Sequence, residues 1–177
     1  MADPAEIANQ MRAAWAEYAV PGPDHALLDR KRGRWNLVLT IYAAPGVVAH
    51  EARGTSTYAW IMGGRVLENL VVGAPGGQPF EGRGYAGFDT RNRQYWFAWF
   101  DSSGTGLMRG EGQALPTVDG IQWSTEATDV VPRGVRRARA VERYLSADEW
   151  RSESYAVGAD GQEWVTVAFH YRRAAEA

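Results

Sequence analysis

One segment gives the clearest structural signal in this chain of 177 residues: Gly33-Arg34-Trp35-Asn36-Leu37-Val38-Leu39-Thr40-Ile41-Tyr42. Every second residue from Trp35 to Ile41 is apolar, whereas the residues between them include both polar and apolar side chains. A period of two is typical of a β-strand that turns one face toward an apolar core. The segment therefore predicts a strand over residues 34–42 whose odd-numbered side chains point inward.

Nine further segments of strand length follow, separated by turns rich in Gly, Pro, Asp and Ser. Asp160-Gly161 is the strongest hairpin signal among these turns. The predicted strands cover residues 34–42, 50–60, 65–73, 80–88, 94–101, 106–114, 121–128, 135–145, 149–157 and 164–173. No helical segment long enough for a crossover interrupts them, so neighbouring strands should pair antiparallel in meander order. Since closure removes exposed sheet edges, we predict an all-β, closed or nearly closed antiparallel barrel of about ten strands.

Two helical segments are expected before the barrel. Residues 4–18 carry apolar side chains at helical spacing, and Asp3 is available as the N-cap. We expect this helix to pack against the barrel wall or to close one end of the barrel. A short helical plug over residues 24–29 then leads into the first strand. The chain is thus predicted to form a single domain, residues 1–177, with an N-terminal helical segment over 1–32 and the barrel over 33–173.

Composition and charge limit the classes of partner. The formal net charge is −2, which supplies no overall field for nucleic acid or an anionic membrane. No apolar run approaches the ~20 residues that cross a bilayer, and the N-terminus lacks the basic start and apolar run of a signal peptide. The chain has no cysteine, which excludes disulfides and thiolate chemistry. We therefore expect a cytoplasmic protein that binds neither nucleic acid nor membranes.

Several separated motifs resemble a bacterial calycin-like family that is catalogued as domain of unknown function 1579. They are Pro21-Gly22-Pro23-Asp24-His25-Ala26-Leu27-Leu28, Gly33-Arg34-Trp35-Asn36, Trp60-Ile61-Met62-Gly63-Gly64-Arg65, Pro79-Phe80-Glu81-Gly82, Gly87-Phe88-Asp89 and Asp101-Ser102-Ser103-Gly104-Thr105-Gly106. The resemblance implies a lipocalin-like barrel with a short N-terminal plug, and it implies no activity. Calycins also share a Gly-x-Trp in the first strand, often covered by an Arg of the last strand. The resemblance therefore implies that Arg172 or Arg173 makes a cation–π contact with Trp35.

A barrel of this size either encloses a cavity or fills it with large side chains. Tyr95, Phe97, Trp99 and Asp101 share one face of their strand, and an aromatic row that ends in a carboxylate at a barrel mouth is one way to build a binding pocket. The full set of predicted ligand-binding residues is Trp35, Tyr95, Trp99, Asp101, Trp123, Arg139 and His170. Arg139 belongs to an arginine-rich strand that forms either an internal anion clamp or an ion-paired outer surface.

No catalytic motif in the sequence is specific. Asp101 and Glu81 are the candidate acid or base residues, provided that burial raises the pKa of the carboxyl. The alternative for Asp101 and the Ser-Gly residues after it is ordinary turn chemistry. The three histidines lack metal-ligand spacing, and no metal or other cofactor is predicted. Haem bound through His170 is left open, because nitrobindins, which are small barrels related to calycins, ligate haem through a histidine near the C-terminus.

Three functions are compatible with the sequence. The first is a barrel that binds a small apolar or amphipathic molecule in its cavity. The second is an enzyme of the isomerase, cyclase or hydratase type that uses one buried carboxylate. The third is a structural or partner-binding protein, most simply a homodimer, whose barrel is filled by its own aromatic side chains. The sequence favours the first, and the contents of the barrel distinguish all three.

Overall fold

The computed structural model describes residues 3–130, 133–158 and 160–175. Over these residues it contains helices α1 (Pro4–Tyr18) and α2 (His25–Asp29), a short 3-10 helix η1 (Pro75–Gly77) and ten strands. The strands are β1 (Gly33–Ala44), β2 (Val47–Ile61), β3 (Val66–Gly73), β4 (Phe80–Asp89), β5 (Gln94–Asp101), β6 (Met108–Ala114), β7 (Gly120–Asp129), β8 (Gly134–Tyr144), β9 (Glu149–Val157) and β10 (Glu163–Arg173). The predicted strands are all present, and the largest difference is that β2 begins at Val47 rather than at residue 50.

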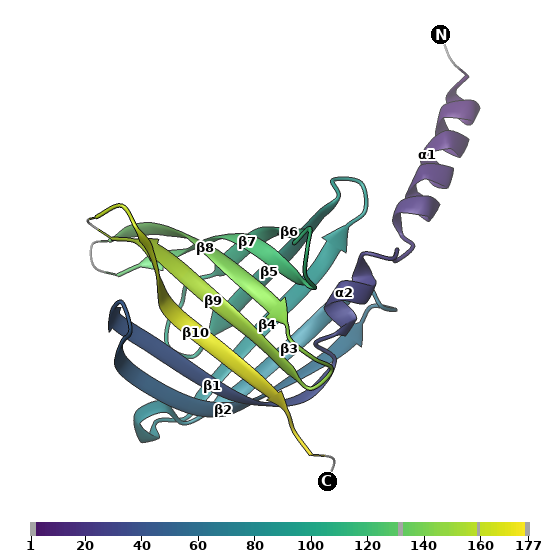
Figure 1. Cartoon of the computed structure of the whole chain (residues 1–177). Helices are drawn as coiled ribbons and strands as arrows, with labels where there is room; N and C mark the ends of the chain where they lie inside the picture. Colours follow the sequence, from purple (N-terminus) through teal and green to yellow (C-terminus); the bar gives the residue numbers. More distant parts are fainter. Residues whose placement is uncertain (1–2, 131–132, 159, 176–177) are drawn as a thin grey trace.

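The ten strands form one closed antiparallel barrel (Figure 1). Each strand pairs with its neighbours in the sequence, and β1 pairs with β10 to close the ring. The register of this seam places Trp35 opposite Arg173 and Ile41 opposite Val167. The ring has no free edge, so every strand has hydrogen-bonding partners on both sides. The predicted all-β meander barrel is confirmed.

A plug made of α2 and the residues after it closes one end of the barrel (Figure 1). Leu28 of α2 is fully buried. Two buried aromatic residues hold the plug in place. The indole N–H of Trp35 donates to the carbonyl oxygen of Lys31 at 2.6 Å, and the Tyr95 hydroxyl donates to the carbonyl oxygen of Asp24 at 3.0 Å. The predicted helical plug is thus present and fixed to the barrel wall.

The seam between the first and last strands carries the cation–π contact that the family resemblance implies. The guanidinium carbon of Arg173 lies 4.2 Å from the ring centroid of Trp35, so Arg173 and not Arg172 makes the contact. The same guanidinium donates to the carbonyl oxygen of Arg32 at 3.1 Å and to Asp148 Oδ1 at 2.8 Å. Arg173 therefore joins the last strand to the end of the plug as well as to the indole.

Helix α1 does not pack against the barrel wall or close an end, so that expectation was wrong. The helix projects away from the barrel (Figure 1), and none of its residues is buried. The barrel end is already covered by α2. Arg91 makes a polar contact between the barrel and α1, donating to the carbonyl oxygen of Ala14 at 3.1 Å.

In the described part of the chain, neither helix combines the length and the apolar character that crossing a bilayer requires.

His25 is a buried titratable side chain of the plug. Its ring centroid lies 6.2 Å from that of Trp60 and 6.0 Å from that of Phe88. The backbone N–H of Gly22 donates to Nδ1 of His25 at 3.1 Å, and a protonated nitrogen is unable to accept this bond. Burial lowers the pKa of His25, and the nearby Asp24 carboxylate offsets the effect only in part.

We predict that the free energy of unfolding decreases as the pH falls below about 6.5, the pKa of an unfolded histidine. In that range the unfolded chain binds a proton more readily than the folded protein does, so acid favours unfolding. Urea titrations at about pH 7.5 and about pH 5.5 should show a smaller decrease for His25→Gln than for the unmodified protein. His50→Gln, at an exposed position, is the matched control. If the free energy of unfolding depended equally on pH in the unmodified protein and in both variants, the lowered pKa of His25 would be contradicted.

Candidate ligand-binding cavity

The barrel encloses a half-open cavity of about 400 Å³. Its lining reaches from Lys31 and Trp150, next to the plug, to Pro75 and Ser103 in connections between strands at the opposite end of the barrel. Most of the wall is apolar. The main apolar lining residues are Leu37, Leu39, Leu67, Val71, Phe97, Trp99, Met108, Trp123, Ala140, Phe169 and Tyr171. A cavity with this lining is suited to an apolar or amphipathic molecule.

Small residues on the inner face of β4 make room for the Trp99 side chain. A Cβ atom on Gly82 would lie 2.2 Å from Cζ2 of Trp99, and one on Gly84 would lie 3.0 Å from Cε3. The indole therefore rests directly on the backbone of the neighbouring strand. This explains why the sequence alternates small residues along one face of β4.

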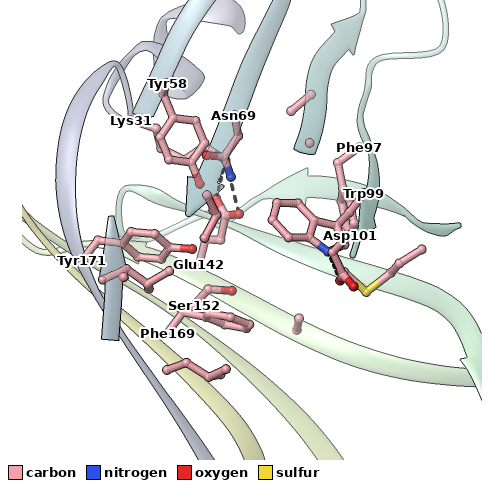
Figure 2. A pocket seen from close by; sticks show the side chains of 18 of the residues that line it. Lys31, Tyr58, Asn69, Phe97, Trp99, Asp101, Glu142, Ser152, Phe169 and Tyr171 are labelled. Carbon is pink, nitrogen blue, oxygen red and sulfur yellow. Dashed lines mark hydrogen bonds and ion pairs between the residues drawn. The ribbon is translucent and has the colours of Figure 1, made fainter. Parts of the chain in front are cut away.

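Lys31 and Glu142 form a buried ion pair at the inner end of the cavity (Figure 2). The ammonium Nζ lies 3.1 Å from Oε2 and 3.3 Å from Oε1 of the carboxylate, and the two side chains are 5% and 12% exposed. The Tyr144 hydroxyl also donates to Oε2, at 3.1 Å. Two charged groups are thus held next to an apolar cavity, a costly arrangement unless each is well paired.

Further polar side chains surround this pair. We call the whole group the inner polar cluster, and it consists of Lys31, Tyr58, Asn69, Glu142, Ser152 and Tyr171 (Figure 2). Burial raises the pKa of both Tyr58 and Tyr171, so their hydroxyls stay protonated at neutral pH. The Tyr171 ring stacks on Trp150 with a centroid distance of 3.6 Å, and the ammonium of Lys31 lies 5.6 Å from the ring centroid of Tyr58.

Asp101 lines the cavity far from the inner polar cluster (Figure 2). Its carboxylate accepts from Trp99 Nε1 at 2.8 Å and from the Ser103 backbone N–H at 2.9 Å, and the Ser103 hydroxyl also donates to it. Burial acts to raise the pKa of Asp101, but these hydrogen bonds outweigh it and lower the pKa below its usual value. The carboxylate is therefore a weak base held in a turn, which is the structural alternative that the sequence left open.

The sequence-predicted residues separate into three groups. Trp99, Asp101 and Trp123 line the cavity, and their contact with a ligand stays a prediction. Trp35 and Tyr95 are buried at the closed end, where they bind the plug rather than form the cavity wall.

The third group lies on the outer face of the barrel. Arg139 forms an ion pair with Glu163 at 2.6 Å, and Nε2 of His170 lies 2.6 Å from Oε1 of Glu149. Glu81 is exposed and pairs with Arg83 at 2.9 Å. Arg139, His170 and Glu81 thus lie outside the cavity lining, which gives no support to their expected roles as an anchor, as an anchor or haem ligand, and as a buried acid. The alternation of each strand turns these side chains away from the cavity.

Sequence reasoning missed the Lys31–Glu142 pair. Glu142 shares its strand face with Ala140, which lines the cavity, so its inward direction follows once that face is known. Lys31 lies between Arg30 and Arg32 in the sequence and gives no local signal. The two residues are 111 positions apart, and only the closed barrel with its plug brings them together.

The family model described as "Protein of unknown function (DUF1579)" matches residues 20–173 of this chain. No curated protein matches this chain. The crystal structure of Rv2717c from M. tuberculosis is similar, with a TM-score of 0.59, 15% sequence identity, and coverage of 88% of this chain and 100% of that one. A redesigned β-barrel has 11% identity and a TM-score of 0.43, covering 83% of this chain and 94% of its own. The first likeness shows the fold, and the second is too weak to support an argument.

Proposed function

This chain belongs to the DUF1579 family of proteins of unknown function, and we propose that it binds a small apolar or amphipathic molecule inside its barrel. The observation that carries the proposal is the cavity itself. The chain has eight tryptophans, and yet its side chains leave about 400 Å³ between apolar walls. That volume lies in the range of about 300–1,000 Å³ that is usual for small-molecule sites.

Two residues of the cavity lining each have a buried donor without a hydrogen-bond partner. The indole N–H groups of Trp123 and Trp150 have no hydrogen-bond acceptor among the described residues. Both residues line the cavity. Buried polar groups are nearly always paired, and exceptions are often found at functional sites. Both N–H groups are buried and do not present a donor to a ligand in the cavity, so the proposal rests on the apolar cavity itself.

The competing functions receive less support. A barrel filled by its own aromatic side chains does not leave a cavity of this size. An acid–base enzyme of the expected kind requires a carboxyl whose pKa is raised by burial. The pKa of Asp101 is lowered, and Glu81 is exposed on the outer face. The buried carboxylate of Glu142 is held in an ion pair with Lys31. The binding function is therefore the best supported of the three.

The uncharged dye N-phenyl-1-naphthylamine tests the proposal, because its fluorescence rises in an apolar site. We expect the dye to bind the unmodified protein and the variant Ser154→Trp to weaken that binding at least about tenfold. Ser154 lines the cavity, so an indole at this position would occupy part of it. Ser124→Trp introduces the same side chain at an exposed position and should change the affinity less than about twofold.

Both variants must first be shown to unfold at a temperature close to that of the unmodified protein. Dye binding that is equal in both folded variants would place the dye on the outer surface and would count against the cavity. Absence of dye binding to the unmodified protein would reject the proposed function.

A further inference from the structure

We infer that the cavity selects molecules whose polar head group is uncharged, such as a hydroxyl, a carbonyl or an amide, because the head group meets the Lys31–Glu142 pair. This inference rests on the proposed function and adds the chemical class of the ligand. The charges of the cavity wall and the hydrogen-bonding groups of the inner polar cluster support it.

The charged groups at the inner end of the cavity balance each other. Of the described lining residues, those with formally charged side chains are Lys31, Arg53, Asp101 and Glu142. The Arg53 side chain is 77% exposed and pairs with Glu51 at 3.0 Å, and Asp101 lies apart from the inner polar cluster. The inner end thus holds one buried ammonium and one buried carboxylate, 3.1 Å apart.

A charged head group would be opposed by one member of this pair. A carboxylate placed beside Lys31 would also face Glu142, and an ammonium placed beside Glu142 would also face Lys31. Either ligand has to displace the existing partner and leave it buried without a counter-charge, which is strongly unfavourable. An uncharged head group leaves the pair intact, so it avoids this penalty.

The rest of the inner polar cluster supplies hydrogen bonds suited to such a head group. The amide oxygen of Asn69 accepts from the Ser56 hydroxyl at 2.8 Å, so Asn69 offers its NH₂ group as a donor. The hydroxyls of Tyr58, Tyr171 and Ser152 can each donate or accept. Together these groups match a hydroxyl or carbonyl, and none of them requires a charge on the ligand.

Three ligands with the same alkyl chain test the inference: 1-decanol, decanoate and decylamine. Each competes with N-phenyl-1-naphthylamine for the unmodified protein at about pH 7.5, where the acid is ionised and the amine is protonated, below the concentration at which it aggregates. We expect 1-decanol to bind at least about tenfold more tightly than either charged compound. Decanoate or decylamine binding as tightly as the alcohol would overturn the inference.

The result also separates this inference from the proposed function. Dye binding with no preference among the three head groups would overturn the inference and leave the proposed function standing. If neither the dye nor any of the three compounds binds, the proposed function fails and the inference fails with it.

Two substitutions give an independent test. Glu142→Gln removes the carboxylate and should shift the preference toward decanoate at least about tenfold, whereas Lys31→Met should shift it toward decylamine. Glu111→Gln also removes a carboxylate, but at an exposed position outside the cavity lining, and should leave the ranking unchanged. A shift of the same size in all three variants, or none in Glu142→Gln and Lys31→Met, would contradict the inference. If these two variants fail to fold, the order of affinities of the three compounds for the unmodified protein still tests the inference.

Discussion

Replacing Trp35 by alanine is expected to lower the free energy of unfolding by about 3–5 kcal/mol, the usual cost of a large-to-small change in a core. The Trp35 side chain is 1% exposed and packs edge-on against Trp150, with ring centroids 6.2 Å apart. Its indole N–H donates to Lys31 in the plug, and its ring faces Arg173 of the last strand. The substitution therefore weakens the core, the plug and the seam together.

Chemical denaturation followed by circular dichroism measures this effect. Trp15→Ala is the matched control, because Trp15 lies on α1 with 64% of its surface exposed. We expect the control to change the free energy of unfolding by less than about 0.5 kcal/mol. A cost below about 1 kcal/mol for Trp35→Ala would mean that the indole is not a central part of the core.

Replacing Lys31 by methionine is expected to lower the free energy of unfolding by about 3–5 kcal/mol, because it leaves the Glu142 carboxylate buried without its partner. Methionine retains most of the apolar stem of lysine, so the cost arises from the lost charge more than from lost packing. The remaining Tyr144 hydroxyl supplies only one hydrogen bond to the carboxylate.

The double variant Lys31→Met/Glu142→Leu distinguishes the charge effect from a packing effect. Replacing both members of a buried ion pair by apolar residues is often close to neutral. We therefore expect the double variant to be more stable than Lys31→Met alone, as measured by the same denaturation experiment. A double variant that is less stable than Lys31→Met would show that the pair is not the source of the cost.

Stability of the double variant would also bear on function. If two apolar residues serve the fold as well as the ion pair does, stability alone does not account for a charged pair beside the cavity. The inner polar cluster would then be understood through what it binds. This would agree with the inference that the pair sets the charge of the ligand head group.

The barrel was predictable from the sequence because its signals are local. Alternating apolar residues give each strand its extended form, and Gly, Pro and Asp residues give each turn its position. Without crossover helices, neighbouring strands pair antiparallel, and closure follows from the need to protect two edges. The cation–π contact at Trp35 was expected from the family resemblance. These features depend on neighbouring residues or on the order of strands.

The position of α1 and the direction of several side chains were not predictable. In β8, Arg136 shares a face with Ala138 and Ala140, and the other arginines lie on the opposite face, so the arginines leave the inward face undecided. Only the register with β7 and β9 turns Ala140 inward and Arg139 outward. The helical pattern of α1 specifies a helix and an apolar stripe, but it does not specify a partner for that stripe.

The sequence by itself therefore determined the class of fold, the number of strands and their order, because hydrophobic period and turn chemistry act over a few residues. Only the tertiary structure decided which side chains line the cavity. Lys31 and Glu142 meet across 111 residues of chain, and Trp35 and Tyr95 donate hydrogen bonds to the plug instead of lining the cavity. Such placements depend on how the closed sheet and its plug fit together, and no local pattern encodes the distance between residues that are remote in the sequence.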